Sequence, residues 1–189
     1  MKTLKFSLML LLSFAVSGCA GVIIAGAATT ANIVTDPRTT QEIWNDNNIE
    51  FEVAGIANKA PFKGKTRITA SSYQGTVVLM GQSETSELLS DFEKKARETK
   101  GVKVIHNQVR IKAPLSLGEI SNDSWITTKV KSSLLANSEL NTIKIKVITE
   151  NREVFLLGYV SAEHAELATD IARNISGVKQ VIKAFQYSE

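Results

Sequence analysis

The sequence Val77-Val78-Leu79-Met80-Gly81 recurs 77 positions later as Val154-Phe155-Leu156-Leu157-Gly158, and this recurrence is the main evidence for the fold. The same offset places residues 67–70 on residues 144–147, and with one deletion Gly101-Val102-Lys103 matches Gly177-Val178-Lys179. A pattern that recurs at a fixed spacing indicates two copies of one structural unit. At about 65 residues, each copy is near the lower size limit for an independent core, so we expect the copies to touch.

Each copy predicts the order helix, strand, strand, helix, strand. In the second copy, Asn122 or Asp123 is the expected N-cap of a helix whose apolar residues recur at spacing four, at Ile126, Val130 and Leu134. The sequence therefore predicts an α+β fold of two tandem αββαβ domains, each with helices packed on a three-stranded sheet. The expected elements are 49–60, 66–72, 76–82, 84–99 and 102–112 in the first copy, and the helix from 122 or 123, 143–147, 154–159, 162–175 and 178–187 in the second.

The start of the chain has the pattern of a secretory signal that ends in a lipobox. Lys2 and Lys5 precede the apolar run 6–16, and the small residues Ser17-Gly18 stand before Cys19, the only cysteine. That run is short of the roughly 20 apolar residues that span a bilayer, and a thiol is nucleophilic enough to take a lipid as a thioether. We expect cleavage before Cys19 and acylation of its sulfur and new N-terminus, palmitate included. An ordinary transmembrane anchor or a buried cysteine is the alternative.

The expected address is the outer membrane, facing the periplasm, because Ala20 follows the cysteine where an aspartate usually retains lipoproteins in the inner membrane. Removal of Lys2 and Lys5 leaves 20 basic against 19 acidic side chains, so the basic net charge is no sign of a nucleic-acid partner. The expected organisation is a signal peptide over 1–18, a lipidated tether over 19–46, domains over 47–112 and 121–189, and a linker over 113–120.

The sequence shows no catalytic constellation. His106 and His164 lie in different copies, without an adjacent nucleophile or a second ligand at metal spacing. There is also no phosphate-binding loop, dinucleotide glycine fingerprint or zinc spacing. We therefore expect no enzyme, no catalytic residue, no cofactor and no metal.

A strand with the pattern Val-x-Leu-x-Gly, then a helix, then Gly-Val-x-x-Val resembles the BON domain, a small module of bacterial envelope proteins associated with phospholipid binding. Thr35-Asp36-Pro37-Arg38, Leu117-Gly118-Glu119 and residues 121–130 resemble the family of dual BON-domain outer-membrane lipoproteins associated with division and outer-membrane stress. One departure is that the final motif of the first copy is shifted by one residue.

The resemblance implies a protein that binds anionic phospholipid through its second BON domain. It also implies support of outer-membrane integrity, presence at division sites, and partners among outer-membrane assembly or division-site proteins.

One face of the helix that follows residue 122 is typical of shallow membrane docking. At 100° per residue, Trp125, Thr128, Ser132 and Leu135 fall away from the core-facing residues, and Lys129 and Lys131 flank them. Tryptophan prefers the water–lipid interface, and each lysine adds about 1 kcal/mol toward an anionic surface. These six residues are the predicted lipid-binding site.

The first copy serves as a comparison. It carries Asn48, Glu50, Glu52 and Asn58 where the second carries Trp125, Thr127, Lys129 and Leu135, so lipid contact is expected of the second copy. Trp44 is expected to pack on the first domain, and the run 94–97 is expected to be a solvated basic face. Two alternatives stay open: Trp125 packs on the neighbouring domain or linker, or its face serves a protein-interaction scaffold for envelope assembly or cell-wall factors.

Overall fold

The computed structural model describes residues 36–140 and 144–188. The predicted signal peptide, Cys19 and the tether up to residue 35 lie outside the described residues. Within those that are described, no helix combines the length and the apolar character needed to cross a bilayer.

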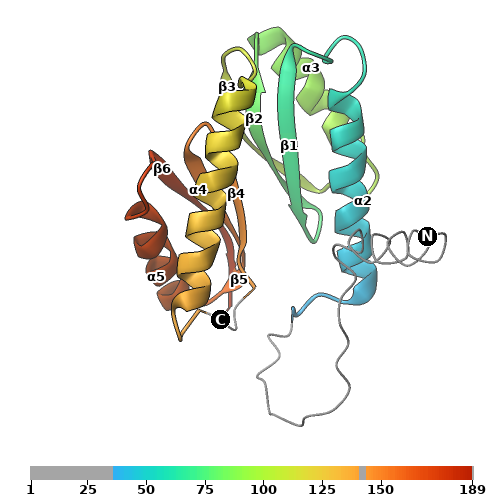
Figure 1. Ribbon diagram of the computed structural model, residues 1–189. Helices are drawn as coiled ribbons and strands as arrows, with labels where there is room; N and C mark the ends of the chain where they lie inside the picture. The colour runs from blue at the N-terminus through green and yellow to red at the C-terminus, as the bar shows by residue number, and fades with distance from the viewer. Residues whose placement is uncertain (1–35, 141–143, 189) are drawn as a thin grey trace, which may run out of the picture. The chain divides into compact units, whose positions relative to one another are not determined.

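The described chain forms two domains of the same topology (Figure 1). In each, the first two strands pair antiparallel and the second and third pair parallel, which places the middle strand at the centre of the sheet. The predicted α+β fold with two three-stranded sheets is confirmed. The first domain consists of α2 (Thr40–Ala57), β1 (Thr66–Tyr73), β2 (Thr76–Ser83), α3 (Ser86–Arg97) and β3 (Val104–Ile111); the second consists of α4 (Leu117–Ala136), β4 (Lys146–Glu150), β5 (Glu153–Val160), α5 (Ala162–Arg173) and β6 (Gln180–Tyr187).

The first helix of each domain begins earlier than predicted. α2 starts behind the N-cap Thr39, and α4 starts behind the N-cap Ser116, inside the predicted linker. Both starts are capping boxes, in which the cap hydroxyl accepts from the backbone N–H three residues on and the glutamate there accepts from the cap N–H. The two boxes occupy equivalent positions in the repeat, Glu42 matching Glu119.

Asp123 therefore does not cap α4. It is buried within the helix, and its carboxylate accepts hydrogen bonds from the backbone N–H groups of Asn151 and Arg152, at 2.6 and 2.8 Å. Both turn residues have positive φ, 53° and 66°, a conformation that costs an L-residue energy. The carboxylate thus fixes the tight turn between β4 and β5 to the helix. Asn122 is exposed and is no cap either.

The same device appears in the first domain. Asp46 of α2 accepts from the N–H groups of Gln74 and Gly75, at 2.8 and 3.0 Å, and so holds the turn between β1 and β2. An aspartate at this position is thus a structural element of the repeat.

Each domain has its own apolar core between its helices and one face of its sheet. Ile49, Val53 and Phe92 are central in the first domain, and Ile126, Val130 and Leu156 in the second. Gly101 and Gly177, both at positive φ, lie against Ile49 and Ile126, and a Cβ added there would lie 3.3 and 3.2 Å from the isoleucine side chains. The predicted core face of α4 is confirmed at Ile126, Val130 and Leu134, all buried.

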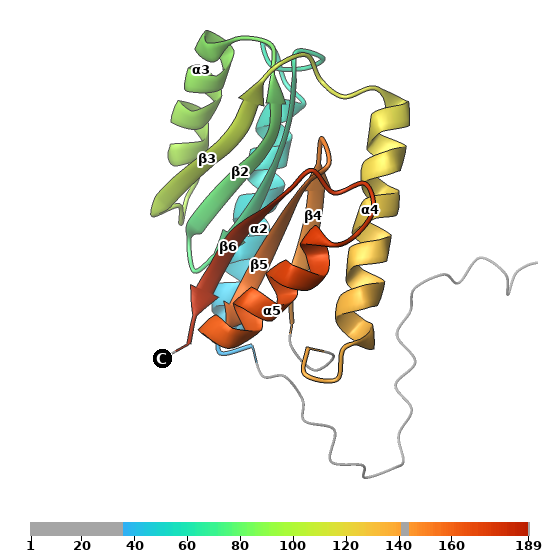
Figure 2. The ribbon, with the colours of Figure 1, turned by 90° about the vertical axis from the view of Figure 1, so that its left-hand side faces the viewer.

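A third apolar cluster joins the two domains through the other faces of the sheets. Val78 and Met80 of β2 pack with Phe155 and Leu157 of β5, and these are equivalent positions of the repeat. Figure 2 shows the strands of both sheets between α3 on one side and α4 on the other. Ion pairs from Arg67 to Glu150 and from Arg110 to Glu153 border this cluster. The predicted contact between the copies is therefore a sheet-to-sheet interface.

Candidate functional site

The side of α4 that faces away from its domain presents two large apolar side chains to solvent. Trp125 is 62% exposed and Leu135 is 64% exposed, although Ile126 and Leu134 beside them are buried. This alternation follows from the helical repeat, because residues three or four apart share a face. The structure thus brings most of the predicted site onto one exposed surface, which we call the α4 face: Trp125, Thr128, Lys131, Ser132 and Leu135.

Lys129 differs from the others. It is half-buried, and its ammonium group donates a hydrogen bond to the backbone carbonyl of Ser176, just beyond α5. The ammonium group of Lys129 therefore already has one hydrogen-bond acceptor within the domain. Lys131 is exposed and has no hydrogen bond or ion pair within residues 36–140 and 144–188, so it is the more accessible of the two lysines.

A small crevice of about 140 Å³ lies at the C-terminal end of the α4 face. The apolar side chains that line it belong to α4, to the end of the following turn, to the residue before β4 and to β4 itself. Lys131 and Leu135 also belong to its lining, so an apolar wall and a positive charge stand together here. The full lining is Lys131, Leu134, Leu135, Leu140, Ile145 and Val147.

The first domain has its own exposed aromatic residues, which the sequence comparison missed. Trp44 is 61% exposed, so the prediction that it packs on the first domain is wrong. Phe51, seven residues later on α2, is 80% exposed. A spacing of seven brings two residues to the same side of a helix, and this was the signal available in the sequence. The position-by-position comparison did not register it, because Trp44 matches Ser121 and Phe51 matches Thr128.

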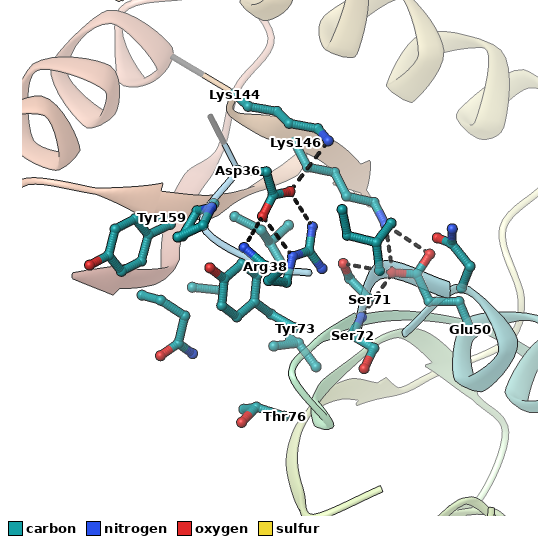
Figure 3. Close-up of a pocket in the computed structure, with 18 residues that line it drawn as sticks. Asp36, Arg38, Glu50, Ser71, Ser72, Tyr73, Thr76, Lys144, Lys146 and Tyr159 are labelled. Carbon is teal, nitrogen blue, oxygen red and sulfur yellow. Dashed lines mark hydrogen bonds and ion pairs between the residues drawn. The ribbon is translucent and has the colours of Figure 1, made fainter. Parts of the chain in front are cut away.

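A cavity of about 280 Å³ lies where the segment before α2 meets both domains (Figure 3). Arg38 closes one side: its guanidinium group pairs with Asp36 at 2.7 Å and Asp46 at 2.8 Å, and lies 4.3 Å from the centre of the Tyr73 ring. These hydrogen bonds from Arg38 lower the pKa of Asp36 to about 2.

The lysines at this cavity also have acidic partners. Lys144 lies 3.4 Å from Asp36, and Lys146 pairs with Glu50 at 2.8 Å. Figure 3 shows both lysines reaching toward these carboxylates. Because each cation has a counter-charge in place, the cavity wall is closer to a network of ion pairs than to an open anion site.

The remaining polar candidates stay apart. His106 is exposed on β3 of the first domain, whereas His164 of α5 shares a hydrogen bond of 2.8 Å with the helix-capping Ser161. Lys94 and Lys95 are exposed on α3, as expected of a solvated face. Among the described residues, no three His, Cys, Asp or Glu side chains are grouped so as to hold a metal ion.

Comparison with known proteins agrees with the two-domain structure. The pattern of the BON domain matches residues 45–113 and 122–189. The chain is 40% identical over 184 residues to "Outer membrane lipoprotein DolP" of Haemophilus influenzae, an alignment that covers 97% of this chain and 95% of that protein.

Two further relatives share less of the chain. "21 kDa hemolysin" of Actinobacillus pleuropneumoniae is 42% identical over 153 residues, which cover 80% of this chain and 79% of the relative. "Osmotically-inducible protein Y" of Escherichia coli is 35% identical over 66 residues, which cover 34% of this chain and 33% of the relative.

Proposed function

Because this chain belongs to the BON-domain family, we propose that it is an outer-membrane lipoprotein whose second domain binds anionic phospholipid through the α4 face. Its anchor is the acylated Cys19, and its domains face the periplasm. The placement is supported by the lipobox at Cys19 and by the relative named as an outer-membrane lipoprotein, which aligns along nearly the whole chain.

The main support for the lipid contact is the exposure of Trp125 and Leu135 on the same face as Lys131. Trp125 is 62% exposed, and transfer of that much of an aromatic side chain to the interface contributes roughly 2–4 kcal/mol at about 25 cal/mol per Å². Lys131 adds about 1 kcal/mol at an anionic surface. Such a contact is weak alone, but a tether gives effective concentrations in the millimolar range, so an anchored protein keeps it occupied.

The site works by partition and needs no bond chemistry. Trp125 enters the headgroup region with its ring apolar and its indole N–H available to a phosphate or carbonyl oxygen. Leu135 and the crevice beside it receive the upper part of an acyl chain, and Lys131 stays at the level of the phosphates. The exposed hydroxyls of Thr128 and Ser132 lie between these groups. The Thr128 hydroxyl donates to the backbone carbonyl of Ser124 at 3.0 Å and so serves lipid as an acceptor, whereas the Ser132 hydroxyl accepts or donates there.

The test is vesicle binding by a chain of residues 20–189, which has no acyl anchor to dominate the measurement. Trp125→Glu should strongly weaken cosedimentation with vesicles that contain phosphatidylglycerol, with an unchanged circular dichroism spectrum. Ser90→Glu, at an exposed position of α3, is the charge-matched control and should bind normally. Undiminished binding by Trp125→Glu would contradict the proposal.

The proposal extends to outer-membrane integrity and to gathering at division sites, which the family resemblance implies. A strain with Trp125→Glu in the chromosomal copy should then become sensitive to detergent and lose septal fluorescence of the tagged protein.

The competing function for this face is a scaffold for an outer-membrane assembly or division-site protein. A photo-crosslinker at Thr128 separates the two, because a scaffold yields a protein adduct that does not depend on anionic lipid.

A further inference from the structure

The first domain presents an aromatic stripe that the proposed function does not use. We call it the α2 face and define it by Trp44, Asn48, Phe51 and Gly55, which recur at spacings of four, three and four. The face lies opposite Ile49 and Val53, which are 1% and 0% exposed and fix α2 to its sheet. Because those contacts hold the helix in place, Trp44 and Phe51 project away from the domain with no described residue covering them.

The repeat shows that this is the same side of the helix as the α4 face. Phe51 is equivalent to Thr128, Gly55 to Ser132 and Asn48 to Trp125. Each domain therefore exposes aromatic or aliphatic side chains at this side of its first helix, but at different positions. Two large aromatic residues on one exposed face form a patch, whereas single exposed apolar residues need no explanation.

Most acidic side chains of α2 have partners, whereas the segment after the helix carries exposed lysines, a balance that favours an anionic surface. The other acids of α2 are occupied: Glu42 by its capping box, Asp46 by the turn and Arg38, and Glu50 by Lys146. Glu52 is the acid of this helix left exposed without a hydrogen bond or ion pair among the described residues. The segment between α2 and β1 carries three exposed lysines that also have no ion-pair partner in residues 36–140 and 144–188: Lys59, Lys63 and Lys65.

The tether joins the first domain directly before this helix, which limits how far from α2 a bilayer that holds Cys19 can lie. Arg38, paired with Asp36 and Asp46, fixes the end of the tether directly before α2. The 17 Cα-to-Cα steps from Cys19 to Asp36 span at most about 60 Å when fully extended. A surface to which Cys19 is bound therefore lies within about 60 Å of Asp36, and Trp44 is the fifth residue of the helix that follows.

We propose that the α2 face is a second membrane-docking surface, in which Trp44 and Phe51 enter the headgroup region of the bilayer and Lys59, Lys63 and Lys65 meet its phosphates. The inference rests on the acyl anchor of the proposed function, but not on the α4 face.

The chain offers a direct test, because it contains two tryptophans and one lies on each face. Full-length acylated protein is reconstituted into vesicles of phosphatidylethanolamine and phosphatidylglycerol, with or without bromine-labelled acyl chains. In Trp125→Phe, fluorescence comes from Trp44 and reports the α2 face. In Trp44→Phe, it comes from Trp125 and reports the α4 face.

We expect brominated lipid to quench Trp44, and Phe51→Glu in the Trp125→Phe background to remove that quenching. Asn45→Glu, an exposed position of α2 off the stripe, is the charge-matched control and should leave it intact. Trp44 unquenched while Trp125 is quenched overturns this inference and leaves the proposed function standing; the reverse result does the opposite. A Trp44 signal that changes with protein density in the vesicles, without quenching by brominated lipid, assigns the face to a second copy and also overturns the inference.

Discussion

Replacing Asp123 by alanine should destabilise the second domain far more than the loss of a helix cap would. The buried carboxylate accepts from two backbone N–H groups, and hydrogen bonds to a charged group contribute about 1.5–3 kcal/mol each. Without it, the N–H groups of Asn151 and Arg152 lose their acceptor, and two residues at positive φ lose their restraint. We expect a loss of roughly 3–5 kcal/mol, the upper end for one substitution.

The assay is urea denaturation of residues 20–189 at neutral pH, followed by circular dichroism. Asn122→Ala is the matched control, since this exposed neighbour should change the free energy of unfolding by less than about 0.5 kcal/mol. Ser116→Ala removes the observed cap and should cost about 1 kcal/mol. A loss below about 1 kcal/mol for Asp123→Ala would refute the assignment of this side chain to the turn.

Other consequences of the structure can be checked separately. Phe155→Ala, at the buried interface between the sheets, should lower the free energy of unfolding by about 3–5 kcal/mol, whereas Phe51→Ala at an exposed site should change it little, and equal effects would contradict the interface. Gly101→Ala and Gly177→Ala should each cost about 1–3 kcal/mol in thermal unfolding, because both glycines have positive φ and abut an isoleucine; an unchanged melting temperature would oppose this. The pKa of Asp36 is lowered from 3.8 to about 2, so the ion pair between Asp36 and Arg38 stabilises the folded state above pH 3.8, and this stabilisation is lost as the pH falls through 2. The NMR signal of the Arg38 Nε–H should shift in that pH range. In Asp36→Asn the pH-dependent shift should be absent.

The fold was predictable because the sequence repeats at a fixed spacing and its strands appear as short apolar runs. The uninterrupted run from Val77 to Met80 also carried the signal of a strand buried on both faces, as its equivalent does in β5. Which partner covers the second face required the structure, because periodicity does not tell sheet-to-sheet packing from packing on a helix.

The helix starts were missed for a different reason. Asp123 stands just before an apolar run, as an N-cap does, but its partner is a turn 28 residues later in the chain. The true caps were visible as Thr39 with Glu42 and Ser116 with Glu119, both of the capping-box spacing.

The candidate site was predictable to the level of a helix face. The exposure of Trp125 and Leu135 follows from helical periodicity, because their neighbours Ile126 and Leu134 point into the core and the two side chains therefore point away from it. The hydrogen bond from Lys129 to the carbonyl of Ser176 was not predictable, since it depends on where the segment after α5 lies relative to α4. The exposure of Trp44 was missed because α2 was expected to start after it.

Lipid contact through the α4 face can be measured residue by residue in backbone NMR spectra of residues 20–189 during titration with anionic lipid micelles. We predict shift changes that saturate together at Trp125, Thr128, Lys131, Ser132 and Leu135, with the Trp125 indole N–H among the largest. No change at these residues, or changes confined to the cavity beside Arg38 and Tyr73, would contradict the account.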